Sequence, residues 1–250
     1  MTETRLLLVH GWGADHRSWD EIAKLVEPWA DVVAPDLAGH GEQAEEHGLT
    51  VDRLADELAG DLSDAAVAVG HSMGGQVVAR LADRYPSLVR AIVVIDPAYG
   101  ADDAEMSRCP AVLADLRERG TEAGVEFVDR AFAGALGSML HLETQAQMAR
   151  TPGPVLADLY ESMYLGSDSI GSRPAARAFL PTIGKPCLSV YSTEYGAAFA
   201  RSLPWPPSSS VEVWPGSTHY LHQEQPGRFA ELLKAWLSTQ PGDGTVSGTF

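Results

Sequence analysis

The sequence predicts an α/β protein: a mostly parallel sheet of about six strands, flanked by helices, with a helical cap inserted between two of the strands. Over the first hundred residues, short apolar runs rich in β-branched residues alternate with segments of helical period, and two further apolar runs occur late in the chain. Apolar runs without polar alternation are typical of strands buried on both faces, and strands that alternate with helices favour right-handed parallel connections. The 250 residues, 45% of them hydrophobic, suffice for one large domain with its own core.

The charge and the cysteine content exclude several classes of protein. The chain has 18 basic and 34 acidic side chains and a formal net charge of −16, whereas binding to nucleic acid or to an anionic membrane needs clustered Lys and Arg. No apolar run approaches the ~20 residues of a membrane-spanning helix. Cys109 and Cys187 lie far apart and belong to no metal-binding pattern, so neither a disulfide framework nor a structural metal site is expected. We expect a soluble, cytoplasmic protein that uses no metal and no cofactor.

Six apolar runs are the candidate strands, and helical segments lie between them. The runs are Leu6–Val9, Val32–Ala34, Ala66–Val69, Ala91–Ile95, Cys187–Tyr191 and Val211–Trp214. Ser18 and Glu21 match a capping box and predict a helix that reaches about Trp29. Thr50 is a suitable N-cap before apolar residues at helical spacing. A last helix is expected after Pro226.

The stretch from residue 101 to 182 interrupts this alternation. It contains no strand-like run but four helical pieces, which are Ala111–Arg119, Thr121–Ala135, Leu140–Arg150 and Val155–Leu165. Such an insertion favours a helical cap over the carboxyl ends of the strands, where open α/β sheets bind ligands; the alternative is a connection packed on the sheet without a role at a site. We therefore expect a core (1–100 and 183–240), a cap (101–182) and a flexible tail (241–250) rich in Gly, Ser and Thr.

The segment GHSMGG, residues 70–75, carries the strongest functional signal. It follows the third apolar run and precedes a helical segment at Gln76–Tyr85. A strand that enters a helix through G-x-S-x-G turns so sharply that Gly70 and Gly74 have no room for a β-carbon. The turn raises the Ser72 hydroxyl above the sheet at a helix N-terminus, where the helix dipole favours developing negative charge. We interpret Ser72 as a catalytic nucleophile; the alternative is a tight turn without chemistry.

The segment HGWG, residues 10–13, follows the first strand and complements the serine. An acyl-transfer enzyme stabilises its oxyanion with two donors, and backbone N–H groups supply these without reorganisation. We expect one donor from Met73, the residue after the nucleophile, and the other from Trp12. The alternative for the second segment is a Gly-rich turn with a core tryptophan.

With these segments the sequence resembles the α/β-hydrolase superfamily, in particular its cap-bearing serine esterase and lactonase-like members. The resemblance covers nearly the whole chain: LLLVHGWG is similar to the family's oxyanion segment, DLAGHG to the loop after its second strand, GHSMGG to its nucleophile elbow and PGSTH to its terminal histidine loop. The HGWG segment and the size of the cap also resemble the pimeloyl-ACP methyl ester esterases. The resemblance implies an α/β-hydrolase fold with Ser72 as nucleophile and His219 as base. It also implies Trp12 and Met73 as the oxyanion donors.

His219 is also the base that the residues themselves favour. A serine hydroxyl needs a base within hydrogen-bond reach, and imidazole titrates near neutrality. Of the eight histidines, only His219 and His222 lie on a loop just past a late strand, as the order Ser, acid, His requires, and His219 comes first. The same two residues have the spacing of a metal-ligand pair, but no nearby carboxylate or cysteine cluster completes such a site. His10 and His71 flank motif glycines, which indicates packing or loop hydrogen bonds.

The acid of the expected triad departs from the family's common pattern. The usual Asp follows the fifth strand, but Tyr195 stands at that position, with Glu194 one residue before it. In some lipases and lactonases of the superfamily the acid instead ends the preceding strand, where this chain has Asp96. Asp96 lies beside the nucleophile strand and is favoured, whereas Glu194 on an extended backbone would point to the opposite side from residue 195. Glu194 is kept as the alternative acid.

The substrate pocket is expected between the sheet and the cap. Its candidate lining residues are aromatic side chains and methionines, each of which also suits a core position: Trp12, Tyr99, Met139, Tyr160, Met163, Tyr164 and Tyr220. Because the net charge disfavours a strongly anionic substrate, we expect a small, largely apolar ester or lactone, cleaved through an acyl-enzyme. Two alternatives use the same residues: a C–C bond hydrolase or lyase, and a non-catalytic small-molecule receptor. The sequence carries no signal for the oligomeric state.

Overall fold

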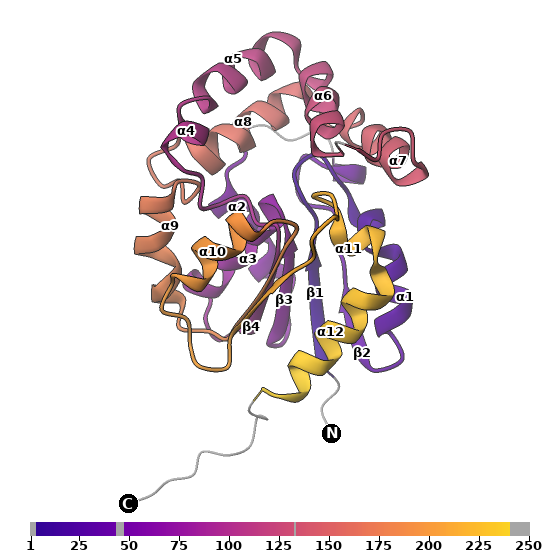
Figure 1. The fold of residues 1–250 in the computed structure, drawn as a ribbon, viewed down its shortest axis with the longest axis vertical. Helices are drawn as coiled ribbons and strands as arrows, with labels where there is room; N and C mark the ends of the chain where they lie inside the picture. Colours follow the sequence, from indigo (N-terminus) through magenta and orange to yellow (C-terminus); the bar gives the residue numbers. More distant parts are fainter. Residues whose placement is uncertain (1–3, 44–47, 133, 241–250) are drawn as a thin grey trace, which may run out of the picture.

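The computed structural model describes residues 4–43, 48–132 and 134–240 and shows a six-stranded sheet (Figure 1). The strand order is β2-β1-β3-β4-β5-β6, and every neighbouring pair is parallel. The strands are β1 (Thr4–Val9), β2 (Ala30–Val33), β3 (Ala66–His71), β4 (Val89–Ile95), β5 (Cys187–Tyr191) and β6 (Ser210–Val213). The six predicted strands are confirmed, with ends that differ from the prediction by two residues or fewer.

The strand register aligns the carboxyl ends of the three central strands. Val9, the last residue of β1, pairs with Gly70 of β3, and His71 at the end of β3 pairs with Ile95 at the end of β4. The chain therefore leaves β1, β3 and β4 at nearly the same level, and the three loops that follow emerge side by side. This edge is where open parallel sheets bind their ligands.

Helices cover both faces of the sheet. They are α1 (Asp20–Val26), α2 (Val51–Asp61), α3 (Met73–Arg84), α10 (Glu194–Arg201), α11 (Leu221–Glu224) and α12 (Pro226–Ser238), with 3₁₀ turns η1 (His16–Trp19) and η2 (Gly41–Gln43). Leu6 and Leu8 of β1 share one apolar cluster with side chains of α1 and α12, whereas Leu7 and Val9 share the other with side chains of α2 and α3. Both faces of the central strands are thus buried, which explains the lack of polar alternation in their sequences.

Two of the predicted helix starts had opposite outcomes. Thr50 caps α2 as expected, because its side chain accepts a hydrogen bond from the backbone N–H of Arg53. The capping box at Ser18 is wrong. Asp15 caps the short turn η1 three residues earlier, the Ser18 hydroxyl donates to the Asp15 carbonyl, and α1 begins at Asp20 without a side-chain cap. A stronger N-cap just upstream took the place of the weaker one.

The segment 101–182 is helical where the structure describes it and lies between β4 and β5. Its elements are α4 (Asp103–Met106), α5 (Cys109–Arg119), α6 (Thr121–Ala131), α7 (Met139–Met148), α8 (Gly153–Tyr164), α9 (Arg173–Phe179) and the 3₁₀ turn η3 (Leu180–Ile183). Figure 1 shows α5, α6, α7 and α8 above the end of the sheet at which β1 and β3 terminate. We call this segment the cap. The predicted tail at 241–250 lies outside the described residues.

The cap and the sheet share one apolar cluster. Leu156 of α8 belongs to the same group of buried side chains as Leu7 of β1 and Val77 of α3. Contact is close enough that a β-carbon on Gly39 would lie 2.7 Å from Val155, and one on Gly13 would lie 2.3 Å from Met148. The cap therefore closes the core instead of enclosing a core of its own. Among the described residues, no helix combines the length and apolarity that crossing a membrane requires.

Candidate active site

Ser72 lies in the sharp turn between β3 and α3, and the glycines of the motif are required there by sterics. A β-carbon on Gly70 would lie 2.1 Å from the carbonyl oxygen of Gly74, and one on Gly74 would lie 2.3 Å from the carbonyl oxygen of Val9. Ser72 itself has φ 52° and ψ −115°, a conformation that side chains rarely adopt. Its N–H donates to the Ile95 carbonyl at 2.9 Å, which holds the turn against β4. Such strain is kept where the surroundings impose it, as at active sites.

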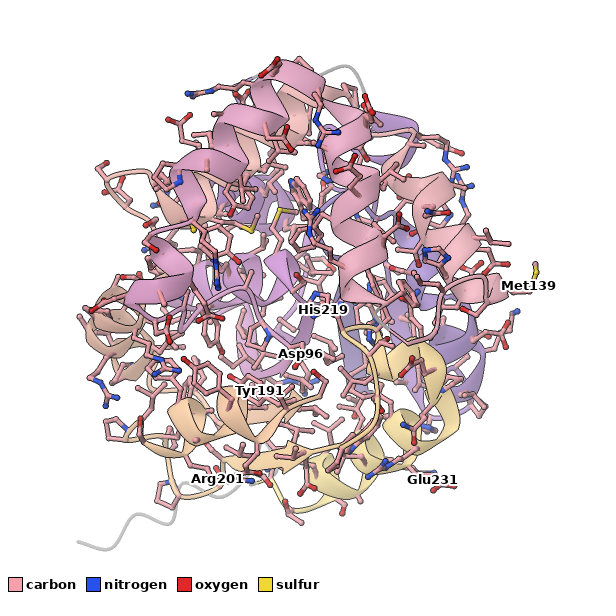
Figure 2. All side chains as sticks on the ribbon, turned by 45° about the horizontal axis from the view of Figure 1, so that its top comes forward. Asp96, Met139, Tyr191, Arg201, His219 and Glu231 are labelled. Atoms are coloured by element: carbon pink, nitrogen blue, oxygen red, sulfur yellow. The ribbon has the colours of Figure 1, made fainter. Side chains whose placement is uncertain are left out.

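His219 and Asp96 approach each other at the carboxyl edge of the sheet. His219 Nδ1 lies 3.3 Å from Asp96 Oδ2, although 123 residues separate them in the chain. Asp96 follows β4 with φ 37°, and its N–H donates to the Val190 carbonyl of β5 at 2.8 Å. Both side chains are largely buried, with 24% of His219 and 11% of Asp96 exposed. Figure 2 shows the two next to each other near the centre of the molecule, below the cap.

Ser72 and His219 line the same cavity. The Ser72 hydroxyl has no hydrogen-bond partner among the described residues, including His219, and bonds between a catalytic serine and its base often tighten only when substrate is bound. The carboxylate beside Nδ1 favours the tautomer in which Nδ1 carries the proton, which leaves Nε2 as a proton acceptor. The arrangement can therefore pass a proton from a serine hydroxyl to an imidazole.

Glu194 does not approach His219. It is the first residue of α10, where Thr193 acts as N-cap, and its carboxylate pairs with Arg201 on the surface. The expected extended backbone at this position is wrong, because the chain turns into a helix directly after β5. Tyr195, at the position of the usual acid, is 53% exposed, and its hydroxyl donates to Asp102.

The two expected oxyanion donors lie beside Ser72. Met73 is the first residue of α3, so its N–H has no partner within the helix. The loop after β1 passes so close to the nucleophile that a β-carbon on Gly11 would lie 3.4 Å from Ser72 Cβ. Within the described part of the chain, the N–H groups of Trp12 and Met73 have no hydrogen-bond partner. The Trp12 indole is fixed separately, since its N–H donates to the Leu156 carbonyl of the cap at 3.0 Å.

The cavity around Ser72 has a volume of about 80 Å³, and residues of the cap form part of its wall. Its walls are mainly aromatic and apolar and carry no Lys, Arg, Asp or Glu side chain: Gly11, Trp12, Ala14, His71, Ser72, Ala98, Phe127, Thr144, Tyr160, Met163, Tyr164, His219 and Tyr220. Five of the seven predicted pocket residues line it, namely Trp12, Tyr160, Met163, Tyr164 and Tyr220.

The other two predicted pocket residues are corrected by the structure. Met139 is 71% exposed, and Figure 2 shows it projecting from the rim of the molecule, away from Asp96 and His219. Tyr99 is buried in the core cluster and does not line the cavity. Phe127 also lines the cavity but was not predicted. It follows the buried Ala123 by four residues on α6, and helical spacing is a signal that indicates such a position.

A cluster of three imidazole rings, tilted against one another, supports the His219 loop. The His71 ring lies 4.7 Å from that of His219 and 4.5 Å from that of His222, and His71 Nε2 donates to the His219 carbonyl at 3.0 Å. Burial lowers the pKa of His71 well below its usual value and that of His222 to about 3, so both rings are neutral at pH 7. They hold the loop in place without adding charge beside the cavity.

Two further buried histidines brace the loops after β1 and β2. His10 Nε2 accepts from the N–H of Leu37 at 3.0 Å, and His40 Nε2 accepts from the N–H of Gly13 at 3.2 Å. Burial lowers the pKa of His10 to about 4 and that of His40 to about 3. Each ring is therefore neutral and links neighbouring loops, in agreement with the loop-bonding role expected for His10.

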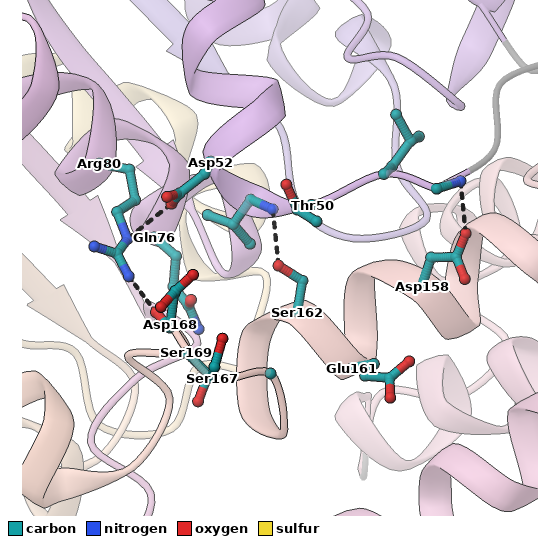
Figure 3. A pocket seen from close by; sticks show the side chains of 14 residues that line it. Thr50, Asp52, Gln76, Arg80, Asp158, Glu161, Ser162, Ser167, Asp168 and Ser169 are labelled. Atoms are coloured by element: carbon teal, nitrogen blue, oxygen red, sulfur yellow. Dashed lines mark hydrogen bonds and ion pairs between the residues drawn. The ribbon is translucent and has the colours of Figure 1, made fainter.

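A larger cavity of about 330 Å³ lies between α2, α3 and α8, but neither Ser72, His219 nor Asp96 lines it (Figure 3). Its polar groups bind one another. Arg80 pairs with Asp52 at 3.0 Å, and the backbone N–H of Val51 donates to the Ser162 hydroxyl at 2.9 Å. The bond to Ser162 attaches the cap to α2, and a bond from the Arg80 side chain to the Asp168 carbonyl attaches it to α3. The smaller cavity, which Ser72 and His219 line, is therefore the candidate active site.

One cluster of described residues could in principle hold a metal ion, but its side chains already form hydrogen bonds and ion pairs within the protein. In the described chain, Asp15, His16 and Asp36 bring their ligand atoms within 4.8 Å of one another. Asp36 accepts from the N–H and from Nδ1 of His16, and Asp15 pairs with Arg150 at 3.2 Å. The ring of His222 packs against Trp19 with a centroid distance of 4.8 Å, and among the described residues its two nitrogens have no hydrogen-bond partner.

A parallel sheet with a strained serine at the end of β3 and a cap over its carboxyl edge defines the α/β-hydrolase class. Residues 6–232 match the model of the Alpha/beta hydrolase family, and the chain belongs to this family. It is 28% identical over 246 residues to a pimeloyl-[acyl-carrier protein] methyl ester esterase of Citrobacter koseri, with 92% of each chain covered.

Solved structures show the same fold. A thermophilic esterase from Thermogutta terrifontis superposes with a TM-score of 0.76 at 24% identity, covering 94% of this chain and 89% of that one. An enol-lactonase from Burkholderia xenovorans superposes with a TM-score of 0.75 at 17% identity, covering 95% of this chain and 92% of that one. Family membership together with the esterase relatives makes the protein a hydrolase.

Proposed function

We propose that the protein is a serine hydrolase that cleaves a carboxylic ester or lactone of a small, largely apolar substrate through an acyl-enzyme. The observation that carries the proposal is one arrangement: Ser72 shares a mainly apolar cavity with His219, whose Nδ1 lies 3.3 Å from Asp96. Ser72 follows β3, Asp96 follows β4, and His219 lies in the loop after β6. Because the strands are parallel, all three residues lie at the carboxyl edge of the sheet.

In this mechanism Ser72 Oγ attacks the carbonyl carbon while His219 Nε2 accepts the hydroxyl proton. The N–H groups of Trp12 and Met73 bind the oxyanion, and Asp96 stabilises the imidazolium. The imidazolium then protonates the leaving alcohol, or the ring-opened hydroxyl of a lactone, and the acyl group stays on Ser72. Water, deprotonated by His219, attacks the acyl-enzyme and releases the acid. These steps need no metal and no cofactor.

The cavity supports a neutral substrate. None of its walls carries a Lys, Arg, Asp or Glu side chain, and the net charge of −16 makes the surrounding field unfavourable to anions. The cap segment 101–182 contains twelve acidic and seven basic side chains, and this net negative charge disfavours the binding of an acidic carrier protein. We therefore propose a free small ester or lactone, although the relative from Citrobacter koseri is named for an ester attached to acyl-carrier protein.

A matched substrate panel tests this function. Purified protein is assayed with short neutral methyl esters, with small lactones and with methyl esters of the same length that end in a carboxylate. We expect turnover of neutral esters or lactones, and we expect kcat/KM for the carboxylate-ended esters to be lower by at least about tenfold. In Ser72→Ala the turnover is expected to fall by about 10⁴-fold or more. Turnover that survives in Ser72→Ala would refute the acyl-enzyme, and a preference for the carboxylate-ended esters would refute the neutral substrate.

A further inference from the structure

Ser192 is the first residue after β5 and lies next to the carboxylate of Asp96. Because β4 and β5 are parallel neighbours in which Ile95 pairs with Val190, the residues just beyond each strand end meet at the same edge. The Ser192 N–H donates to Asp96 Oδ1 at 2.9 Å, and its hydroxyl donates to Asp96 Oδ2 at 2.5 Å. One residue thus holds both oxygens of the carboxylate, in addition to the bond from His219 Nδ1 at 3.3 Å.

We propose that Ser192 is a positioning residue for the triad, which orients the Asp96 carboxylate toward His219; this inference rests on the proposed serine-hydrolase function. Two donors on opposite oxygens fix the rotation of the carboxylate about its Cβ–Cγ bond, whereas with the backbone N–H alone Oδ2 would be held only by the longer bond from His219. The hold matters because Asp96 sits in a strained loop conformation, with φ 37°, and is only 11% exposed. Burial of a polar group costs free energy unless its atoms form hydrogen bonds, and the donors of Ser192 supply these to both oxygens.

The hydroxyl of Ser192 and the imidazole of His219 share one acceptor atom. Both bonds end on Asp96 Oδ2, and the serine bond is the shorter of the two. Ser192 fixes the plane of the Asp96 carboxylate, and this plane sets the direction of the second lone pair of Oδ2. Because His219 Nδ1 donates to that lone pair, the orientation of the His219 ring depends on Ser192. Ser192 acts on the reaction only through Asp96 and has no place in the cavity wall.

The contacts of Ser192 explain how the triad can use an acid at the end of β4, although the family's usual acid follows β5. In this chain the segment after β5 holds no acid that faces His219, since Glu194 and Tyr195 both point to the surface. The first residue of that segment instead supplies two donors to the acid at the end of β4. The same sheet edge therefore still orients the base, through hydrogen bonds to the relocated carboxylate.

The test compares Ser192→Ala, Ser192→Thr and Ser189→Ala in the full-length protein. Ser189 is the matched control, because it is a buried serine on the same strand whose hydroxyl contacts Cys187 and not Asp96. Loss of a hydrogen bond to a charged group predicts a kcat about 10- to 100-fold lower in Ser192→Ala with KM nearly unchanged. Ser192→Thr, which keeps the hydroxyl, is expected to recover most of kcat, and Ser189→Ala to stay within about twofold of the wild type.

Two readouts separate positioning from a general structural effect. In the Asp96→Asn background, Ser192→Ala is expected to cause no further loss, because Ser192 acts through the carboxylate. The downfield proton resonance of His219 Nδ1–H is expected to shift in Ser192→Ala and to stay in place in Ser189→Ala. If Ser192→Ala does not fold, Ser192→Cys, with its weak donor, replaces it with the same expected direction.

The outcomes distinguish this inference from the proposed function. If Ser192→Ala keeps kcat within twofold, or if its loss adds in full to that of Asp96→Asn, Ser192 is not a positioning residue even though the enzyme is a serine hydrolase. If the wild type reacts with no fluorophosphonate at Ser72, the proposed function itself has failed.

Discussion

Replacement of Asp96 by Asn probes the acid of the triad while the shape of the side chain is retained. Three donors converge on this carboxylate: the N–H of Ser192 on Oδ1, and the hydroxyl of Ser192 together with Nδ1 of His219 on Oδ2. Asn offers a single oxygen. If that oxygen keeps the Ser192 N–H, the amide group faces His219 and donates to Nδ1, so the imidazole proton moves to Nε2 and the ring can no longer accept the Ser72 proton.

The expected loss can be stated as a free energy. The same replacement in a comparable triad lowers kcat by about 10⁴-fold, which corresponds to about 5.5 kcal/mol of transition-state stabilisation at 1.36 kcal/mol per tenfold. Glu194→Gln is the matched control, because it also removes one carboxylate charge but breaks only a surface ion pair with Arg201. Such pairs contribute about 0–1 kcal/mol to stability, so kcat/KM of this variant is expected within about twofold of the wild type.

The assay is steady-state hydrolysis of one neutral ester by the two variants, with circular dichroism to show that both are folded. The reverse ranking, with Glu194→Gln inactive and Asp96→Asn active, would assign the acid to Glu194. Equal, small effects of both substitutions would mean that His219 works without either carboxylate.

Three further predictions concern stability and specificity. Gly70→Ala should cost about 2–4 kcal/mol of stability, because its β-carbon would lie 2.1 Å from a backbone oxygen, whereas Gly60→Ala, with open space around the site, should be neutral or stabilising in a denaturant titration. The free energy of unfolding should fall as pH drops from about 6.5 toward 3, since His222 binds a proton in the unfolded chain before it does so in the folded one; His222→Phe should remove about 2 kcal/mol of that fall at pH 5. Met163→Ala should enlarge the cavity, so that the ratio of kcat/KM for esters with longer acyl chains to kcat/KM for acetate esters rises by about tenfold. Met139→Ala, on the surface, should leave this ratio unchanged.

Each of these predictions has a contrary result. Equal stability of the Gly70 and Gly60 variants would show that the turn at the nucleophile tolerates a β-carbon. An unchanged pH dependence in His222→Phe would mean that this ring is charged or hydrated in the folded protein. A change of acyl-chain preference in Met139→Ala equal to that in Met163→Ala would place the substrate outside the cavity described above.

The elements predicted well from the sequence are those that depend on local sterics and on burial. The strands are recognised because both of their faces are buried, and the turn at Ser72 is recognised because Gly70 and Gly74 have backbone atoms within 2.1–2.3 Å of where a β-carbon would lie. The early helix start failed because Asp15 competes with Ser18 as N-cap. That outcome depends on a small free-energy difference between adjacent caps.

The remaining features depend on contacts between distant parts of the chain. Whether Glu194 or Asp96 faces His219 depends on α10, which begins shortly after β5 because Thr193 caps it. A Thr followed by an acidic residue is a local signal for this helix start, but it competes with the extended backbone that a strand end favours. Met139 and Met163 both lie on cap helices, and helical spacing alone does not tell which side of a helix faces the sheet. The two hydrogen bonds from Ser192 to Asp96 join residues 96 positions apart and have no local signature.

The central claim is that Ser72 is a nucleophile activated by His219, and covalent labelling tests it most directly. Purified protein is treated with a fluorophosphonate probe, the intact mass is measured over time, and the modified residue is identified by peptide mapping. We expect one adduct per chain, located on Ser72, with none in Ser72→Ala and with labelling slowed by several orders of magnitude in His219→Ala. An unlabelled wild type that nevertheless hydrolyses esters, or equal labelling of Ser72→Ala, would contradict the account.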